Sequence, residues 1–190
     1  NALMLHVDVG MGAALLIDGK VYEGSHGFAG EIGYFKLNML LSDENNYGNL
    51  NYGNYYDSTS LFSVLSIVKR EISLGTETVL KDWLEASGRS WDDVTIDELL
   101  KAYRLKDALV VRAIHSAARV IGTFASSMSD FLDLDTVILI GSVTGLGKEY
   151  LKYISKYAKN CPVVFSELGS DATIMGTINA GILAVFDGLL

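Results

Sequence analysis

Residues 3–24 read LMLHVDVGMGAALLIDGKVYEG, and this stretch predicts how the fold begins. The runs LMLHVDV (3–9) and AALLI (13–17) are rich in residues that favour β-strands, and KVYEG follows across Asp18-Gly19. An Asp-Gly pair between two apolar runs favours a type I′ hairpin, because both turn positions require a positive φ. We therefore expect the chain to open with antiparallel strands, and a further strand is predicted over Gly33–Leu37.

The remainder of the chain alternates between helical and strand patterns after a polar stretch at 38–58. Ser60 is a predicted N-cap for a helix over 61–72, and Asp107 begins a long helix with apolar residues at every third or fourth position. The other predicted helices are at 77–86, 95–103, 146–158 and 171–186, and the other predicted strands are TVILIG (136–141) and PVVFSE (162–167). Hairpin strands followed by alternating helices and strands indicate an α/β lobe with a mixed sheet.

Size and composition limit the class of protein. A chain of 190 residues suits one domain or one large lobe, and no apolar run has the length of a membrane span. The net charge of −8 and the lack of a basic cluster argue against nucleic-acid binding by this chain itself. A single cysteine, Cys161, forms no internal disulfide, which fits a reducing, cytoplasmic setting. The chain begins Asn-Ala without an initiator Met, so we expect it to be the C-terminal part of a longer protein.

Two glycine-rich segments could bind a ligand. Gly10-Met11-Gly12 follows the first strand, where glycines let backbone N–H groups approach a phosphate; the alternative is a tight turn. Glu31 stands in GFAGEIG, and a carboxylate on such a segment can accept the hydroxyl hydrogen bonds of a polyol. The alternative for Glu31 is a turn glutamate in solvent.

Three further features allow a functional or a purely structural interpretation. The Asn/Tyr/Gly stretch from Tyr47 to Tyr56 could stack rings on a sugar and bond its hydroxyls, or be a polar loop. His115 is expected to be a packed helix residue, and Cys161 a small apolar filler.

Four segments in order resemble the ROK family of repressors and sugar kinases. GSHGFAGEIGYFKL (24–37) resembles the family's Gly-x-x-Gly-Glu-Ile-Gly-His signature, and VDVGMGAALLIDGKVYEG (7–24) its second phosphate loop. TVILIGSVTGLG (136–147) and SELGSDATIMGTINAGILAVF (166–186) resemble the adenosine-side strand and the closing helix. The resemblance implies a ribonuclease-H-like, actin-like ATPase fold. Residues 1–190 would form its C-terminal lobe, without the N-terminal lobe or any DNA-binding domain.

The resemblance also carries expectations about the sugar and zinc sites. It implies that Glu31 binds sugar, together with the positions of Tyr34 and Tyr56. The family's zinc-binding histidine is Tyr34 here, and its three zinc cysteines are replaced at Tyr47, Asn49 and Asn54. We therefore expect no zinc.

The nucleotide site departs from the family pattern as well. The family's Gly-Thr-Gly reads Asp8-Val9-Gly10, and its adenosine-side Gly-Gly reads Gly141-Ser142. A carboxylate about 4 Å from a phosphate costs roughly 4 kcal/mol at an effective dielectric near 20. ATP and magnesium binding are therefore expected to be lost or degraded. The degenerate site comprises Asp8, Gly10, Gly12, Gly141 and Ser142.

Three functional hypotheses remain open at this stage. The first is the sugar-sensing and dimerisation lobe of a transcriptional regulator, which contacts DNA through a missing N-terminal domain. The second is the C-terminal half of a zinc-free sugar kinase. In the family the catalytic aspartate lies upstream of residue 1, so this chain alone is not expected to phosphorylate a sugar. The third is a degenerate lobe that only dimerises.

Overall fold

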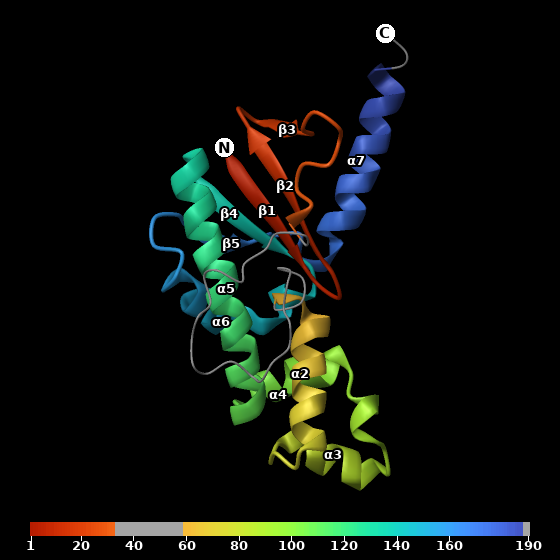
Figure 1. Cartoon of the computed structure of the whole chain (residues 1–190). Helices are drawn as coiled ribbons and strands as arrows, with labels where there is room; N and C mark the ends of the chain where they lie inside the picture. The colour runs from red at the N-terminus through yellow and green to blue at the C-terminus, as the bar shows by residue number, and fades with distance from the viewer. Residues whose placement is uncertain (33–58, 188–190) are drawn as a thin grey trace.

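A five-stranded mixed sheet forms the centre of the computed structural model, which describes residues 1–32 and 59–187 (Figure 1). The strand order is β3-β2-β1-β4-β5. β1 pairs antiparallel with β2 and parallel with β4, β2 is antiparallel to β3, and β4 is parallel to β5. The strands are β1 Ala2–Val7, β2 Met11–Ile17, β3 Lys20–Tyr22, β4 Thr136–Ile140 and β5 Val163–Phe165. This arrangement confirms the predicted α/β lobe with a mixed sheet.

The hairpin between β2 and β3 turns at Asp18-Gly19, as predicted. Asp18 has φ 50° and Gly19 has φ 73°, so both turn positions have the positive φ that this turn requires. The further strand predicted at 33–37 lies outside the described residues.

The predicted helices are present with small differences at their ends. They are α2 Leu61–Ser73, α3 Val79–Ser87, α4 Ile96–Arg104, α5 Ala108–Leu132, α6 Gly147–Ser155 and α7 Ala172–Asp187, with short 3₁₀ turns η2 Trp91–Asp93, η3 Ser142–Leu146 and η4 Gly169–Asp171. Ser60 caps α2 by accepting from the Ser63 backbone N–H, and Asp107 caps α5 by accepting from that of Val110. The helix expected at 146–158 ends at Ser155, three residues early.

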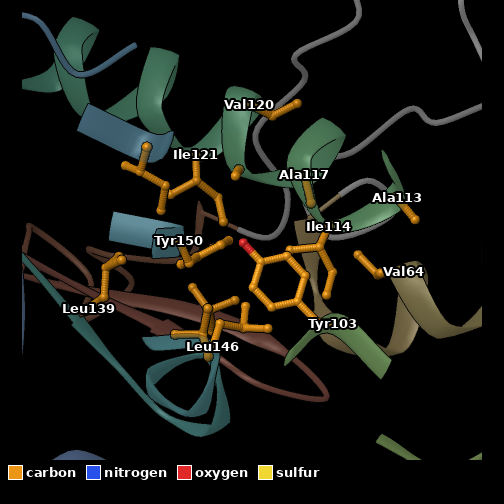
Figure 2. Close-up of a cluster of buried hydrophobic side chains, with 14 of the residues drawn as sticks. Val64, Tyr103, Ala113, Ile114, Ala117, Val120, Ile121, Leu139, Leu146 and Tyr150 are labelled. Atoms are coloured by element: carbon orange, nitrogen blue, oxygen red, sulfur yellow. The ribbon is translucent and has the colours of Figure 1, made fainter. Parts of the chain in front are cut away.

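The hydrophobic core lies between the sheet and α5, with contributions from α2, α4 and α6 (Figure 2). Leu3, Leu5 and Val7 alternate along β1 and are buried, as the period of a strand with one covered face requires. In the described part of the chain, α5 is the one helix that is long and apolar enough to cross a membrane. However, 61% of its most apolar window is buried, so it is the core helix of this lobe.

Helix α7 runs away from the sheet (Figure 1), and several of its apolar side chains are exposed. Its exposed apolar residues include Ile174, Met175, Ile178 and Ile182. An apolar surface of this extent is usually covered by another chain or by another part of the same protein.

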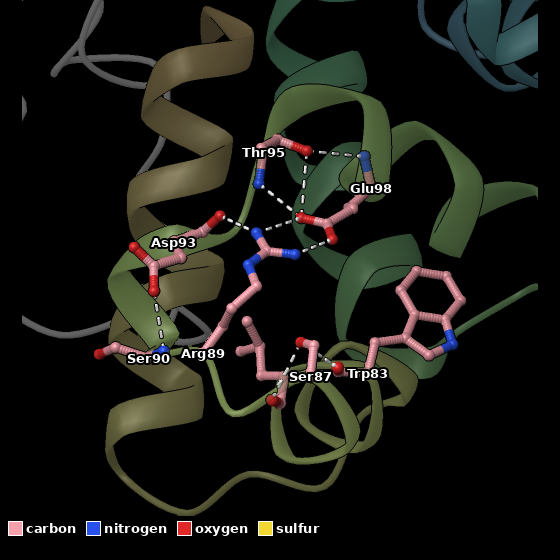
Figure 3. Close-up of polar contacts among 8 residues, drawn as sticks. Trp83, Ser87, Arg89, Ser90, Asp93, Thr95 and Glu98 are labelled. Atoms are coloured by element: carbon pink, nitrogen blue, oxygen red, sulfur yellow. Dashed lines mark hydrogen bonds and ion pairs between the residues drawn. The ribbon is translucent and has the colours of Figure 1, made fainter.

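A polar network ties α4 to the segment that precedes it (Figure 3). The Arg89 guanidinium donates to both carboxylate oxygens of Glu98, at 2.7 and 3.2 Å, and also to the Asp93 carbonyl. Glu98 accepts from the Thr95 backbone N–H at 3.0 Å, and Thr95 Oγ1 accepts from the Glu98 N–H at 3.3 Å. This is a capping box whose acid is also held by a bidentate arginine.

The network predicts a pH-dependent contribution to stability. The hydrogen bond from Arg89 lowers the pKa of Glu98 to about 2, and the Thr95 bonds act in the same direction against the effect of burial. A lowered folded-state pKa stabilises the fold above the unfolded value and loses that effect as the pH falls toward 2. Glu98→Gln should therefore lower the free energy of unfolding by about 1 kcal/mol at pH 7, since the pair is partly solvated, and by much less near pH 2. Urea unfolding at both pH values measures this, with Asp97→Asn on the same helix as control. If Glu98→Gln lowered the free energy of unfolding by the same amount at both pH values, the prediction would be wrong.

Candidate functional site

The carboxyl ends of the parallel strands β1 and β4 lie side by side. From these ends the chain continues in opposite directions along the sheet. The connection after β1 leads to β2 on one side, and the connection after β4 leads to β5 on the other. In open α/β sheets, ligands bind in the crevice outside the carboxyl ends of strands at such a switch point. Asp8 follows β1, and Gly141-Ser142 follows β4. The two segments that were predicted to form a degenerate nucleotide site therefore meet at this edge.

Asp8 and Ser142 are bonded to each other across this edge. The Ser142 backbone N–H donates to Asp8 Oδ2 at 3.0 Å, and the Ser142 hydroxyl donates to the same oxygen at 2.7 Å. The other carboxylate oxygen, Oδ1, accepts from the Val9 N–H at 2.8 Å. The two departures from the family pattern thus form one hydrogen-bonded pair.

The backbone of Asp8 holds two further segments. Its N–H donates to the Gly10 carbonyl at 2.9 Å, and its carbonyl accepts from the Leu61 N–H, the first of α2, at 2.8 Å. Residue 8 therefore joins the β1–β2 turn, the start of α2 and the segment after β4.

The surroundings of Asp8 keep its carboxyl ionised. Partial burial acts to raise the pKa of Asp8, but the bonds from Ser142 and Val9, with a smaller contribution from His6, outweigh it, so the pKa lies below its ordinary value. His6 Nε2 is 4.0 Å from Asp8 Oδ2, which is an ion pair only when the imidazole is protonated.

The predicted glycines of this site have different surroundings. Gly141 has φ +89°, and a Cβ there would lie 2.8 Å from both the Val7 carbonyl oxygen and His6 Cδ2. Glycine is therefore required for the close approach of the β4 and β1 ends. Gly12 lies in β2 opposite His6, with open space where a Cβ would point.

Glu31 follows a glycine that is pressed against β2. Gly30 has φ +91°, its carbonyl accepts from the Ala13 N–H at 3.0 Å, and a Cβ there would lie 2.0 Å from the Ala13 carbonyl oxygen. Ile32, on the other side of Glu31, packs against the core. Glu31 itself is exposed, so its carboxylate is presented to solvent from a segment that is fixed on both sides.

The other predicted sugar and zinc positions lie outside the described residues. These are Tyr34, Tyr56 and the replaced zinc ligands at Tyr47, Asn49 and Asn54. Within residues 1–32 and 59–187, no three His, Cys, Asp or Glu side chains are grouped so that they could hold a metal ion. The expectation of no zinc remains a prediction.

Two residues at this site were not predicted from the sequence to belong to it. His6 lies within the predicted strand LMLHVDV without a predicted role, and Leu61 is only the first residue of a predicted helix. The i, i+2 spacing of His6, in β1, and Asp8, directly after it, would place both side chains on one face if the strand continued, and this spacing was an available signal. No local signal connects Leu61 to Asp8.

His115 and Cys161 are structural, as predicted. His115 Nε2 is 3.1 Å from the Tyr103 hydroxyl, and its ring stacks on Tyr153 with centroids 3.8 Å apart. Burial, aided by Lys156, lowers the pKa of His115. Cys161 is buried in the core.

Comparison with solved structures identifies the fold class of this chain. The mixed sheet and its helices have the ribonuclease-H-like, actin-like ATPase fold, as the following solved structures indicate. A solved ROK family glucokinase from Streptomyces griseus aligns with a TM-score of 0.73 at 19% identity, over 90% of this chain and 57% of that one. A ROK family transcriptional regulator, a homologue of the E. coli MLC protein, aligns with a TM-score of 0.68 at 20% identity, over 87% of this chain and 41% of that one.

The chain is similar in sequence to members of the ROK family. The model of that family matches residues 1–57. The xylose repressor of Caldicellulosiruptor bescii is 24% identical over 94% of this chain and 45% of its own length. The N-acetylmannosamine kinase of Vibrio cholerae is 27% identical over 87% of this chain and 50% of its own length. The chain thus spans about half the length of these relatives, which include both repressors and kinases.

Proposed function

We propose that this chain is the sugar-sensing effector and dimerisation lobe of a ROK family transcriptional regulator, and that it is catalytically inactive as it stands. The observation that carries the proposal is the setting of Glu31. Its carboxylate is exposed, while Gly30 and Ile32 fix the backbone on either side. A carboxylate on a segment whose backbone is already ordered can accept two sugar hydroxyls without the cost of ordering that segment.

A regulator requires less of this fold than a kinase does. It needs a ligand that binds one conformation better than another, by a few kcal/mol, so that DNA affinity changes. It needs neither zinc nor ATP and magnesium, and we propose that none is bound. The DNA-binding domain would lie in another part of a cytoplasmic protein. A homodimer would offer one way to cover the exposed apolar face of α7.

The second candidate function is the C-terminal half of a zinc-free sugar kinase. The relation to the N-acetylmannosamine kinase of Vibrio cholerae favours it. The ionised Asp8 at the crevice argues for the regulator, because a carboxylate there opposes a polyphosphate.

The regulator proposal predicts a ligand effect at Glu31. We expect the natural full-length protein to bind one of xylose, N-acetylglucosamine, N-acetylmannosamine or glucose, and Glu31→Gln to weaken that binding by about 1–3 kcal/mol, because buried sugar hydroxyls lose a charged acceptor. Calorimetric titration measures the affinity. Glu23→Gln, on the preceding exposed turn, is the matched control and should leave the affinity unchanged.

The same protein separates the two functions. For a regulator, the bound sugar should shift the affinity for operator DNA, and no sugar phosphate should form with ATP and magnesium. Sugar phosphorylation without any effect on DNA binding would support the kinase. An unchanged affinity in Glu31→Gln would remove Glu31 from the site under either function.

A further inference from the structure

A side-chain pair lies at the carboxyl ends of β1 and β4, the edge where ligands bind in open α/β sheets. Asp8 and Ser142 come from the ends of adjacent parallel strands, 134 residues apart in sequence. They are joined by two hydrogen bonds to one carboxylate oxygen, at 2.7 and 3.0 Å. The second oxygen is held by Val9. Both oxygens are thus fixed in position, and both polar hydrogens of Ser142 are used.

We propose that Asp8 is the specificity-determining residue of this crevice, and that Ser142 is its positioning residue. The bonded pair excludes phosphate anions from the carboxyl ends of β1 and β4. It also links the segment after β1 to the segment after β4, as a bound phosphate otherwise could. This inference goes beyond the sugar-sensing role and does not depend on it.

Two physical effects combine in the exclusion. A phosphate would meet a fixed negative charge at short range in a partly buried position. It would also find the backbone N–H groups of Val9 and Ser142, which could have bound an anion, already donating to Asp8. The carboxylate therefore repels the anion and occupies its donors.

The pair also has a mechanical consequence. Because the Asp8 carbonyl accepts from Leu61, a displacement of Asp8 is transmitted to the start of α2 as well as to the segment after β4. Two side chains of the chain itself thus hold the neighbouring turns together in this structure.

Anion titration and amide exchange of the natural full-length protein test both parts. The probe is inorganic tripolyphosphate without divalent cation, measured by calorimetry. We expect no binding to the unaltered protein at millimolar concentration, and binding at least tenfold tighter in Asp8→Asn, which removes the charge with little change in shape. The gain should shrink in high salt. Asp18→Asn, on the hairpin turn, makes the same charge change away from the crevice and should gain nothing.

Hydrogen exchange then tests the link between the turns. Asp8→Asn and Ser142→Ala should each speed exchange of the amides of Val9, Leu61 and Ser142 at least tenfold, and the double variant should add little to the larger single effect. Additive effects of the two substitutions would overturn the pairing. Equal anion affinity in Asp8→Asn and Asp18→Asn would overturn the exclusion. Neither result depends on whether the protein binds a sugar, so failure here and failure of the regulator assignment are distinguishable.

Discussion

Gly30→Ala is expected to lower the free energy of unfolding by at least about 3 kcal/mol, one of the two largest effects of a single substitution predicted for this lobe. The added Cβ would lie 2.0 Å from the Ala13 carbonyl oxygen, a contact with backbone that no side-chain rotation can relieve. Gly30 also has φ +91°, where an L side chain is strained. The segment would have to leave β2 and break the bond from the Ala13 N–H to the Gly30 carbonyl. Urea unfolding of the purified protein measures the loss.

Gly27 provides a matched control for this substitution. It has φ +73°, but nothing lies within 4 Å of the position that a Cβ would take. Gly27→Ala should therefore cost only the backbone strain, about 1–2 kcal/mol. If the two variants lost equal free energy of unfolding, the contact with Ala13 would not contribute to the cost of Gly30→Ala. If Glu31 binds sugar, Gly30→Ala should also reduce sugar affinity, because it displaces the neighbouring carboxylate.

Local signals in the sequence predicted the elements of this fold well. The Asp18-Gly19 turn depends on two adjacent residues that tolerate positive φ, and it is present as expected. The helix starts at Ser60 and Asp107 were equally local, because an N-cap accepts from a backbone N–H within three residues. Such features need no knowledge of the tertiary fold.

The contacts that define the site could not be read in the same way. The sequence indicated Asp8 and Ser142 as two separate losses from a nucleotide site, whereas the structure bonds them to each other. That bond requires β1 and β4 to be adjacent, parallel and in one particular register, which no local pattern specifies. The fixed position of Gly30 likewise depends on Ala13, seventeen residues earlier.

Asp107→Ala is the second large expected effect, with a loss of about 2–4 kcal/mol in the free energy of unfolding. One carboxylate oxygen of Asp107 accepts from the Val110 N–H at 3.0 Å and so caps α5. The other accepts at 2.9 Å from both the Thr78 hydroxyl and the Val79 N–H at the start of α3. Loss of an N-cap costs about 1 kcal/mol for one helix. Here two helix starts and a buried threonine hydroxyl lose their acceptor together, and each unsatisfied group adds its own cost.

Three further variants separate these contributions in urea unfolding experiments. Asp107→Asn keeps one acceptor oxygen and should lose about half as much as Asp107→Ala. Thr78→Val removes only the hydroxyl partner and should lose about 1 kcal/mol. Asp97→Ala, an exposed acid in the first turn of α4, should lose no more than about 0.5 kcal/mol. If Asp107→Ala were as mild as Asp97→Ala, the shared cap would contribute nothing. Among these variants we expect the largest loss of stability in Asp107→Ala, because Asp107 couples α3 to the core helix α5 across 28 residues of sequence.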